Sequence, residues 1–336
     1  MRLALREAER GIGHTSPNPA VGALIVSPRG RILARGWHRR AGEPHAEIEA
    51  MLTLGKMKRA RGATLFVTLE PCSTHGRTPP CTDAIIAAGF SRVVIGTLDP
   101  NPAHAGRGIG ILEKAGISVS RGVLAERCRE LNKSFNKWIV TKMPFVIAKC
   151  GMSLDGRITR RPGEDQWLTS EASRADAQKL RAEVDAILIG GETLRTDNPR
   201  LTVRTVPGAK QPWRIILSRS GDLPPGAHVF TDEHKSRTLV YKRKTLRAVL
   251  RDLGRREITS VMIEGGMRTL GEAFDTRLVD RVQFYIAPLL TGGPKLCIGG
   301  CGAGSTAASA QLANPHYQRI GDDIRLTGDV TFSSAG

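Results

Sequence analysis

Residues 68–81 read TLEPCSTHGRTPPC, a stretch that joins a predicted strand to a predicted helix. The strand prediction covers 63–70, which is rich in β-branched and apolar residues. The helix prediction covers 81–89 and begins directly after Pro79-Pro80, because proline is tolerated at a helix start but not inside the helix. A strand followed at once by a helix is typical of α/β folds.

The same alternation of strands and helices continues on both sides of this stretch. We predict a helix over 1–12, paired strands over 21–26 and 31–37, a helix over 45–55, strands over 92–97 and 117–120, and helices over 108–116 and 123–141. Pro144 follows the last helix and stops it. We therefore place a domain junction here and expect two domains, 1–142 and 143–336.

A second set of alternating elements fills the rest of the chain. We predict strands over 144–153, 185–191, 212–218, 237–242, 258–264 and 278–290, and helices over 170–183, 245–254 and near 267–275. The tail after about 327 lacks such a pattern, and we expect it to be loosely ordered. Both parts are thus predicted to belong to the α/β class.

Three side chains of the first part predict a zinc site: His45, Cys72 and Cys81. Imidazole and thiolate are ligands that zinc prefers, and three protein ligands leave a fourth position for water. Glu47 is predicted to move the proton during hydrolysis. Residues i and i+2 of a helix point to nearly opposite sides, so His45 and Glu47 can converge only if the helix begins at His45, and Pro44 favours that start. The alternative is a core histidine with two buried thiols.

Composition limits the class of protein and of partner. The chain has 336 residues and a net charge of +18, which suits a phosphorylated small molecule or a nucleic acid, but only 4% of its residues are aromatic, which disfavours a surface that stacks on single strands. The first residues lack the order of a signal peptide, and no apolar run is long enough to span a membrane, so we expect a cytoplasmic protein without a membrane partner. Cys297 and Cys301 lie in a glycine-rich loop without a third ligand type, which disfavours a second metal site.

The motif TLEPCSTHGRTPPC, with SPNPAVG at 16–22, resembles the bifunctional riboflavin biosynthesis proteins over nearly the whole chain. The resemblance implies a cytidine-deaminase-like three-layer domain followed by a dihydrofolate-reductase-like domain, with zinc and NADPH as cofactors. It implies hydrolytic deamination of 2,5-diamino-6-ribosylamino-4(3H)-pyrimidinone 5′-phosphate. Reduction of the ribosyl chain would then give 5-amino-6-(5-phosphoribitylamino)uracil. A homo-oligomer that binds this small molecule and no nucleic acid is also expected.

The resemblance implies deaminase substrate contacts for Asn18, His75 and Arg77. A guanidinium suits a phosphate because it is planar and always charged. The alternatives are a turn residue between two prolines for Asn18 and a solvated loop charge for Arg77.

The second part has no G-x-G-x-x-G motif, so a standard dinucleotide fold is not indicated. Its glycine pairs, 190–191 and 265–266, follow predicted strands and suit either a phosphate or a tight turn. The resemblance implies NADPH contacts for five residues: Gly151, Trp167, Thr193, Asp197 and Gly266. It implies substrate contacts for five more: Asp165, Arg181, Leu201, Arg204 and Glu264. The family often has serine at position 165, and an acidic residue there would repel a phosphate. For Arg181, the alternative to a substrate contact is a charge on a solvent-exposed helix face.

Two other functions are compatible with parts of the sequence. A nucleic-acid deaminase with a C-terminal RNA-binding module fits the charge and the His-x-Glu and Pro-Cys motifs, but RNA-binding motifs are absent from the sequence. A non-catalytic relative with structural zinc would need a fourth protein ligand, and His75 is the nearest candidate.

Overall fold

The computed structural model describes residues 1–336 except 56–59, 76–78, 103, 159–166 and 333–336. Contacts divide the chain into two compact units, Met1–Lys142 and Met143–Gly336. Within the described residues, no helix is both long and apolar enough to cross a membrane. The predicted α/β class is confirmed in both units.

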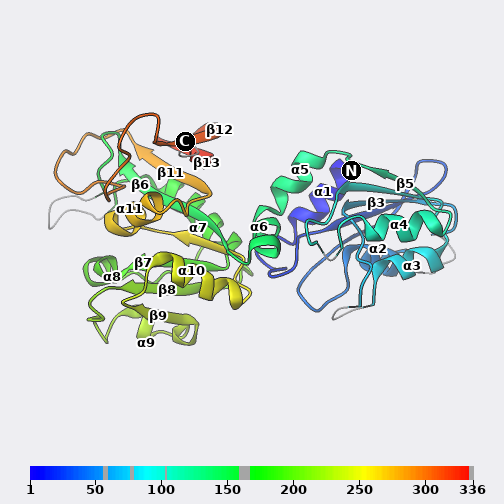
Figure 1. Ribbon diagram of the computed structural model, residues 1–336, viewed down its shortest axis with the longest axis horizontal. Coiled ribbons are helices and arrows are strands. Elements are labelled where there is room, and N and C mark those ends of the chain that lie inside the picture. Colours follow the sequence, from blue (N-terminus) through cyan, green and yellow to red (C-terminus); the bar gives the residue numbers. More distant parts are fainter. Residues whose placement is uncertain (56–59, 76–78, 103, 159–166, 333–336) are drawn as a thin grey trace. The chain divides into compact units, whose positions relative to one another are not determined.

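Unit 1 is a five-stranded sheet between two layers of helices (Figure 1). The strand order is β2 (Ile32–Trp37), β1 (Gly22–Val26), β3 (Thr64–Leu69), β4 (Arg92–Thr97) and β5 (Ser118–Arg121), and the last three strands are parallel. One helix layer holds α2 (Ala46–Leu54), α3 (Cys81–Ala88) and α4 (Arg107–Lys114), and the other holds α1 (Arg2–Glu9) and α5 (Ala125–Leu131). This is the predicted three-layer arrangement.

Helix α2 lies directly on the backbone of β2. A Cβ added at Gly36 would come within 2.3 Å of the Ala50 nitrogen and 2.5 Å of the Ala46 oxygen, so only glycine fits there. The close approach fixes the height of α2 above the sheet. It therefore also fixes where the first residues of α2 lie.

The prediction of one continuous helix over 123–141 is wrong, because two helices that are separated at one residue occupy this range. Helix α5 ends at Leu131, and α6 (Lys133–Thr141) begins after Asn132. The buried Asn132 side chain accepts a hydrogen bond from the Ala20 nitrogen (2.8 Å) and donates one to the Ala20 oxygen (2.9 Å). At this break between the two helices, the Asn132 side chain thus connects the 16–22 segment to the helical layer.

Unit 2 is built on an eight-stranded sheet with helices on both faces. The strand order is β12 (Ala310–Ile320), β13 (Asp323–Phe332), β11 (Arg281–Ala287), β6 (Phe145–Ser153), β10 (Ser260–Ile263), β7 (Ala186–Gly190), β8 (Trp213–Ser218) and β9 (Thr238–Lys242). From β11 to β9 all neighbours are parallel, so their carboxyl ends share one edge. Helices α10 (Leu246–Arg255) and α11 (Met267–Asp275) pack on one face, and α7 (Glu171–Glu183), α8 (Gly191–Asp197) and α9 (His228–Thr231) pack on the other.

The hairpin β12–β13 was not predicted, and the expected loose tail after about 327 is wrong, because β13 continues to Phe332. Strand β12 lies at the edge of the sheet, and most of its residues are exposed. An exposed edge strand has no apolar face, so its sequence lacks the alternation that identifies a strand. Helices α8 and α9 were also missed, since each is shorter than any helix that was predicted.

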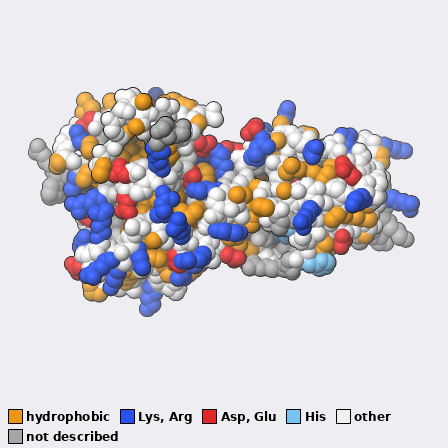
Figure 2. Space-filling model, in the orientation of Figure 1, with side chains coloured by type: hydrophobic (Ala, Val, Ile, Leu, Met, Phe, Trp, Pro, Cys, Tyr) orange, Lys and Arg blue, Asp and Glu red, His pale blue; other side chains and the backbone are white. Residues whose placement is uncertain are grey.

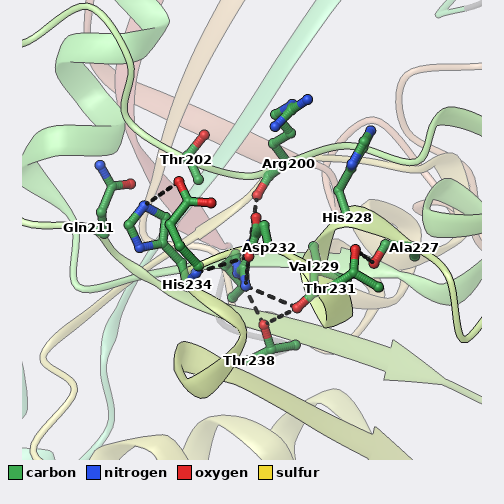
Figure 3. Close-up of polar contacts among 12 residues, drawn as sticks. Arg200, Thr202, Gln211, Ala227, His228, Val229, Thr231, Asp232, His234 and Thr238 are labelled. Atoms are coloured by element: carbon green, nitrogen blue, oxygen red, sulfur yellow. Dashed lines mark hydrogen bonds and ion pairs between the residues drawn. The ribbon is translucent and has the colours of Figure 1, made fainter.

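An ion pair whose two side chains are 1% and 7% exposed joins β8 to the segments around it, and Figure 3 shows the surroundings of its acidic member, Asp232. Arg214 is 1% exposed, and its Nη1 and Nη2 bind the two carboxylate oxygens of Asp232 at 2.6 and 2.9 Å. The same guanidinium also donates to the Arg200 and Val229 carbonyls and to the Thr238 hydroxyl. All five N–H donors of Arg214 therefore have acceptors.

Replacing this arginine is expected to destabilise unit 2. Arg214→Gln would leave the Asp232 carboxylate buried without its partner, which costs about 3–5 kcal/mol. Urea-dependent hydrogen exchange of β8 peptides in the full chain measures the loss. Arg255→Gln removes an exposed charge from the same unit and should change stability by less than about 0.5 kcal/mol. Equal effects of the two substitutions would contradict the role given to Arg214.

Candidate functional site

Three elements of unit 1 bring one imidazole and two thiols together. His45 is the residue before α2, with φ −70° and ψ 164°, so the helix begins where the sequence predicts. Cys72 follows β3, and Cys81 is the first residue of α3. Their ligand atoms all lie within 4.8 Å of one another. No other such group of metal-ligand side chains is found among the described residues.

The distances fit a tetrahedral ion. His45 Nδ1 lies 3.3 Å from Cys81 Sγ and 3.5 Å from Cys72 Sγ. Zinc bonds of about 2.1 Å to nitrogen and about 2.3 Å to sulfur at tetrahedral angles put ligand atoms about 3.5 Å apart. The donor set and its spacing therefore fit Zn²⁺, and described residues offer no fourth ligand in this group.

Of the two thiols, Cys72 is favoured as a thiolate and Cys81 as a thiol. Hydrogen bonding by the Cys81 thiol, followed by contacts with His45 and the Cys81 backbone, lowers the pKa of Cys72 to about 4 despite burial. The Cys81 nitrogen, at the start of α3, donates to Cys72 Sγ at 3.3 Å. The contact with that thiolate raises the pKa of Cys81. Without metal, the pair thus keeps one proton, which a bound cation would displace.

Glu47 lies in the first turn of α2 and is 3% exposed. Burial raises the pKa of Glu47 to about 7, and the nearby His45 opposes this rise. The carboxyl group also hydrogen bonds with the Cys81 side chain, so it lies beside the metal-ligand group without belonging to it. A bound cation would favour its carboxylate form.

Asn18 is held near the metal-ligand group by His38. Asn18 Nδ2 lies 3.1 Å from His38 Nε2, and His38 Nδ1 lies 3.0 Å from the Pro44 oxygen. The ring of His38 meets the ring of His45 edge to face at 5.3 Å. Since the Pro44 carbonyl can only accept, His38 donates from Nδ1 and accepts from Asn18. The amide of Asn18 is thereby oriented, and Asn132 holds the neighbouring Ala20.

Glu70, the acidic residue of the Glu-Pro-Cys motif, has a structural role. Its buried carboxylate accepts hydrogen bonds from the backbone nitrogens of Asp99, Gly106 and Gly108. It thereby ties the end of β3 to the segment that leads into α4. His75 is exposed, and Arg77 lies outside the described residues, so the structure leaves both predicted contacts as predictions.

In unit 2, three of the five predicted cofactor residues lie along the carboxyl edge of the parallel strands. Gly151 is near the end of β6, Thr193 is in α8 after β7, and Gly266 precedes α11 after β10. A Cβ added at Gly266 would lie 2.9 Å from Thr193 Oγ1, so the starts of α8 and α11 are close together. Ligands of open α/β sheets bind at this edge, and the backbone N–H groups of a helix start attract a phosphate. The edge therefore fits a dinucleotide phosphate.

Glu264, a predicted substrate residue, joins a second one, Arg181, to Lys149, a lysine of β6 that was not predicted as a site residue. Arg181 Nη2 donates to Glu264 Oε2 at 2.7 Å, and Lys149 Nζ donates to Glu264 Oε1 at 2.8 Å. Burial by itself would raise the pKa of Glu264, but Arg181 and Lys149 outweigh it and hold the pKa at about 2. Arg181 is not on a solvated helix face, because its side chain is only 10% exposed.

The other residues that were predicted to form the sites of unit 2 have no hydrogen bond to Glu264 among the described contacts. Leu201 is 2% exposed, so its side chain belongs to the core, whereas the next carbonyl, of Thr202, accepts a hydrogen bond from Arg181. Partial burial, followed by the charge of Arg181, lowers the pKa of Arg204. Trp167 and Asp197 are exposed, and Asp165 lies outside the described residues.

Three residues that the sequence analysis missed form hydrogen bonds that position other residues of the two sites. His38 and Asn132 orient the 16–22 segment, and Lys149 pairs with Glu264. The lysine could have been found from its place in the strand, because Lys149 and Gly151 lie on the same face of β6. No local pattern marks the contact of His38 with Asn18 or that of Asn132 with Ala20, because these partners lie 20 and 112 positions away in the sequence.

Comparisons with known proteins agree with both halves of this description. Residues 1–97 match the cytidine and deoxycytidylate deaminase zinc-binding region, and residues 144–326 match the RibD C-terminal domain. The riboflavin biosynthesis protein RibD of Aquifex aeolicus is 40% identical, over 96% of each chain. The second part therefore does not resemble an RNA-binding module.

Two solved structures are similar over almost the whole chain. Acinetobacter baumannii RibD (form 1) superposes with a TM-score of 0.89 at 34% identity, over 98% of this chain and 97% of that one. A Thermotoga maritima diaminohydroxyphosphoribosylaminopyrimidine deaminase/5-amino-6-(5-phosphoribosylamino)uracil reductase gives the same TM-score, identity and coverage.

Proposed function

Because the chain belongs to the RibD family of riboflavin biosynthesis proteins, we propose that unit 1 carries its deaminase site and unit 2 its reductase site. The enzyme is a bifunctional zinc-dependent deaminase and NADPH-dependent reductase. Its substrate is the phosphorylated diaminopyrimidine named above, and its product is 5-amino-6-(5-phosphoribitylamino)uracil. The observation that carries the deaminase assignment is the convergence of His45, Cys72 and Cys81 beside a buried Glu47.

In the deaminase site, His45, Cys72 and Cys81 would hold zinc, which when bound makes a water molecule acidic enough to give hydroxide at neutral pH. Glu47 takes the proton from the attacking water and gives a proton to the departing amine. The bond from the ring carbon to the amine breaks, and ammonia and a ring carbonyl result. Burial of Glu47 keeps bulk water from competing for this proton.

Asn18, His75 and Arg77 would bind the deaminase substrate. The contact with His38 supports this role for Asn18, because it turns the amide toward a fixed direction next to His45. A polar group held in advance gains affinity, since little ordering remains for the binding step. His75 and Arg77 follow Cys72 closely in the sequence, and a cation there suits the substrate phosphate.

In the reductase site, Gly151, Trp167, Thr193, Asp197 and Gly266 would contact NADPH, which supplies a hydride. Addition of this hydride to C1 of the ribosyl group would break the bond from C1 to the ring oxygen, and that oxygen would need a proton. Lys149 is the proton donor that we propose, because Glu264 holds its ammonium group on the same strand face as Gly151.

Arg181, Leu201, Arg204 and Glu264 would bind the reductase substrate, with the phosphate near Arg204. The excess of positive charge at Arg181 and Arg204 supports this assignment. Asp165 remains a predicted contact of the same site. The Leu201 contact would come from its backbone, since its side chain is buried.

The proposal is tested by a metal analysis combined with assays on the diaminopyrimidine phosphate. The purified full chain should contain one zinc per chain. It should release ammonia without NADPH and oxidise NADPH only after the deamination step. Ammonia release at an unchanged rate after complete removal of zinc would reject the deaminase site.

We also expect a homo-oligomer that binds no nucleic acid. Strand β12 supports self-association, because an exposed edge strand offers unpaired backbone groups to a second copy, and Tyr317 on it is 66% exposed. Light scattering of the full chain should give a mass of at least twice 36.3 kDa. A monomer at micromolar concentration would contradict this expectation.

A further inference from the structure

Lys149, the proposed proton donor of the reductase reaction, is a largely buried cation. Lys and Arg side chains are spread over the visible face of the molecule (Figure 2), whereas the Lys149 side chain is only 16% exposed. A buried ammonium group loses water contacts, so it needs protein groups that stabilise its charge and fix its direction. Glu264 is one such group, and the ring of Tyr285 is a second.

Tyr285 turns the face of its ring toward Lys149. The Lys149 Nζ lies over this ring, 5.9 Å from its centroid. Tyr285 of β11 pairs with Gly151 of β6. Lys149 lies two positions before Gly151, so its side chain is on the same face of the sheet as that of Tyr285. The face of an aromatic ring carries partial negative charge and attracts a cation within about 6 Å, more strongly where water is excluded.

The hydroxyl group of Tyr285 fixes the ring in this place. Tyr285 is 1% exposed. Its oxygen accepts a hydrogen bond from Gln283 Nε2 at 2.6 Å, and its proton is donated to Asp176 Oδ2 at 2.9 Å. Arg325 Nη1 donates to the same Asp176 oxygen at 2.7 Å, which holds the carboxylate in turn. Any shift of the ring away from Lys149 would therefore strain both hydrogen bonds of the hydroxyl group.

One helix holds both partners of Lys149. Asp176 and Arg181 belong to α7. Asp176 accepts the hydrogen bond of the Tyr285 hydroxyl, and Arg181 Nη2 donates to Glu264 Oε2 at 2.7 Å. A single hydrogen bond to Glu264 would let the ammonium group swing about the carboxylate oxygen. The ring face adds a second contact, and the two contacts together limit the ammonium group to one direction.

We propose that Tyr285 is a positioning residue of the reductase: its ring face holds the Lys149 ammonium group where it can give a proton to the ribosyl ring oxygen. The inference rests on the proposed role of Lys149 as proton donor. A proton donor must lie within hydrogen-bond reach of its acceptor, so loss of the fixed direction lowers kcat. The ring of Tyr285 acts through Lys149 and touches neither substrate nor cofactor, so KM should not depend on it.

A change of ring charge at nearly constant shape tests the proposal. Phenylalanine at position 285 keeps a negative ring face, whereas pentafluorophenylalanine has a similar size but no negative ring face, because fluorine withdraws electrons. In the full chain, Tyr285→Phe should keep kcat for NADPH oxidation with deaminated substrate within about threefold of the wild type. Pentafluorophenylalanine at position 285 should lower kcat about fivefold or more below that of Tyr285→Phe. KM for NADPH and for substrate should stay within about twofold.

The same two variants in a Lys149→Met background show whether Tyr285 acts through Lys149. Without the ammonium group their kcat values should be equal, because the ring face then has no cation to attract. Pentafluorophenylalanine in place of Phe230, a partly buried residue of α9, is the matched control and should leave kcat unchanged. Equal kcat values of the two variants beside an intact Lys149, or the same drop in both backgrounds, would overturn the proposal.

Lys149→Met by itself separates this inference from the proposed function. Reduction at the wild-type rate by Lys149→Met would reject the proton-donor role of Lys149 and, with it, the role of Tyr285. A slow Lys149→Met variant, together with equal kcat values of the two variants at position 285, would reject the role of Tyr285 alone.

Discussion

Glu47→Gln should lower the rate of deamination by at least about 10³-fold while zinc stays bound. In the proposed mechanism the carboxylate moves two protons, from the attacking water and to the leaving amine, and general acid–base groups of this kind contribute about 10²–10⁴-fold. Glutamine has the same shape but cannot take a proton at neutral pH. The three metal-ligand side chains are untouched, so the zinc content should not change. Ammonia release and elemental analysis measure the two quantities on one sample.

Glu49→Gln is the matched control for this substitution. Glu49 belongs to the same helix, but its carboxylate pairs with Arg39 at 3.4 Å. We expect its deamination rate to stay within about twofold, because such surface pairs contribute little. The reductase activity of Glu47→Gln on deaminated substrate should equal that of the wild type. Deamination within tenfold of the wild-type rate, or a loss of zinc, would show that Glu47 has a different role.

Much of the metal-ligand group could be predicted because its geometry is local. The side chains of residues i and i+2 diverge inside a helix, so His45 and Glu47 can converge only if α2 begins at His45, and Pro44 favours that start. The structure has α2 begin there. Cys81 opens α3 for a similar local reason, the two prolines before it. Metal ligands that lie at the start of a helix can therefore be predicted from the residues next to them.

The parts that could not be predicted depend on contacts between distant segments. Asn132 breaks the expected helix over 123–141 because its amide bonds to Ala20, which is 112 positions away. Strand β12 is exposed on both faces for most of its length, so it carries no burial pattern. Lys149 was not predicted as a site residue, because its partner Glu264 follows a different strand and lies 115 positions away in the sequence.

Glu264→Gln should abolish most of the reductase activity and leave deamination intact. The substitution removes the carboxylate that pairs with both Lys149 and Arg181, so both cations lose this partner in a largely buried place. Breaking such a pair costs about 3–5 kcal/mol of stability. It also frees the ammonium group that we propose as proton donor, and we expect the rate of reduction to fall at least about 100-fold. Glu264→Asp, which keeps the charge, should recover part of the activity.

The pH dependence of stability separates the charge of Glu264 from its packing. The pKa of Glu264 is lowered from 4.5 to about 2 in the folded chain, so the carboxylate stabilises unit 2 fully above about pH 5. This contribution, about 3 kcal/mol, is lost as the pH falls from about 5 toward 2, because protonation then favours the unfolded chain. The difference between wild type and Glu264→Gln, measured by urea-dependent hydrogen exchange of β6 peptides, should therefore shrink between pH 6 and pH 3. Glu233→Gln, whose side chain is 76% exposed, should give no difference at any pH. A gap between wild type and Glu264→Gln that stays constant with pH would mean that shape rather than charge holds this cluster, and the role of Glu264 in holding Lys149 would then be wrong.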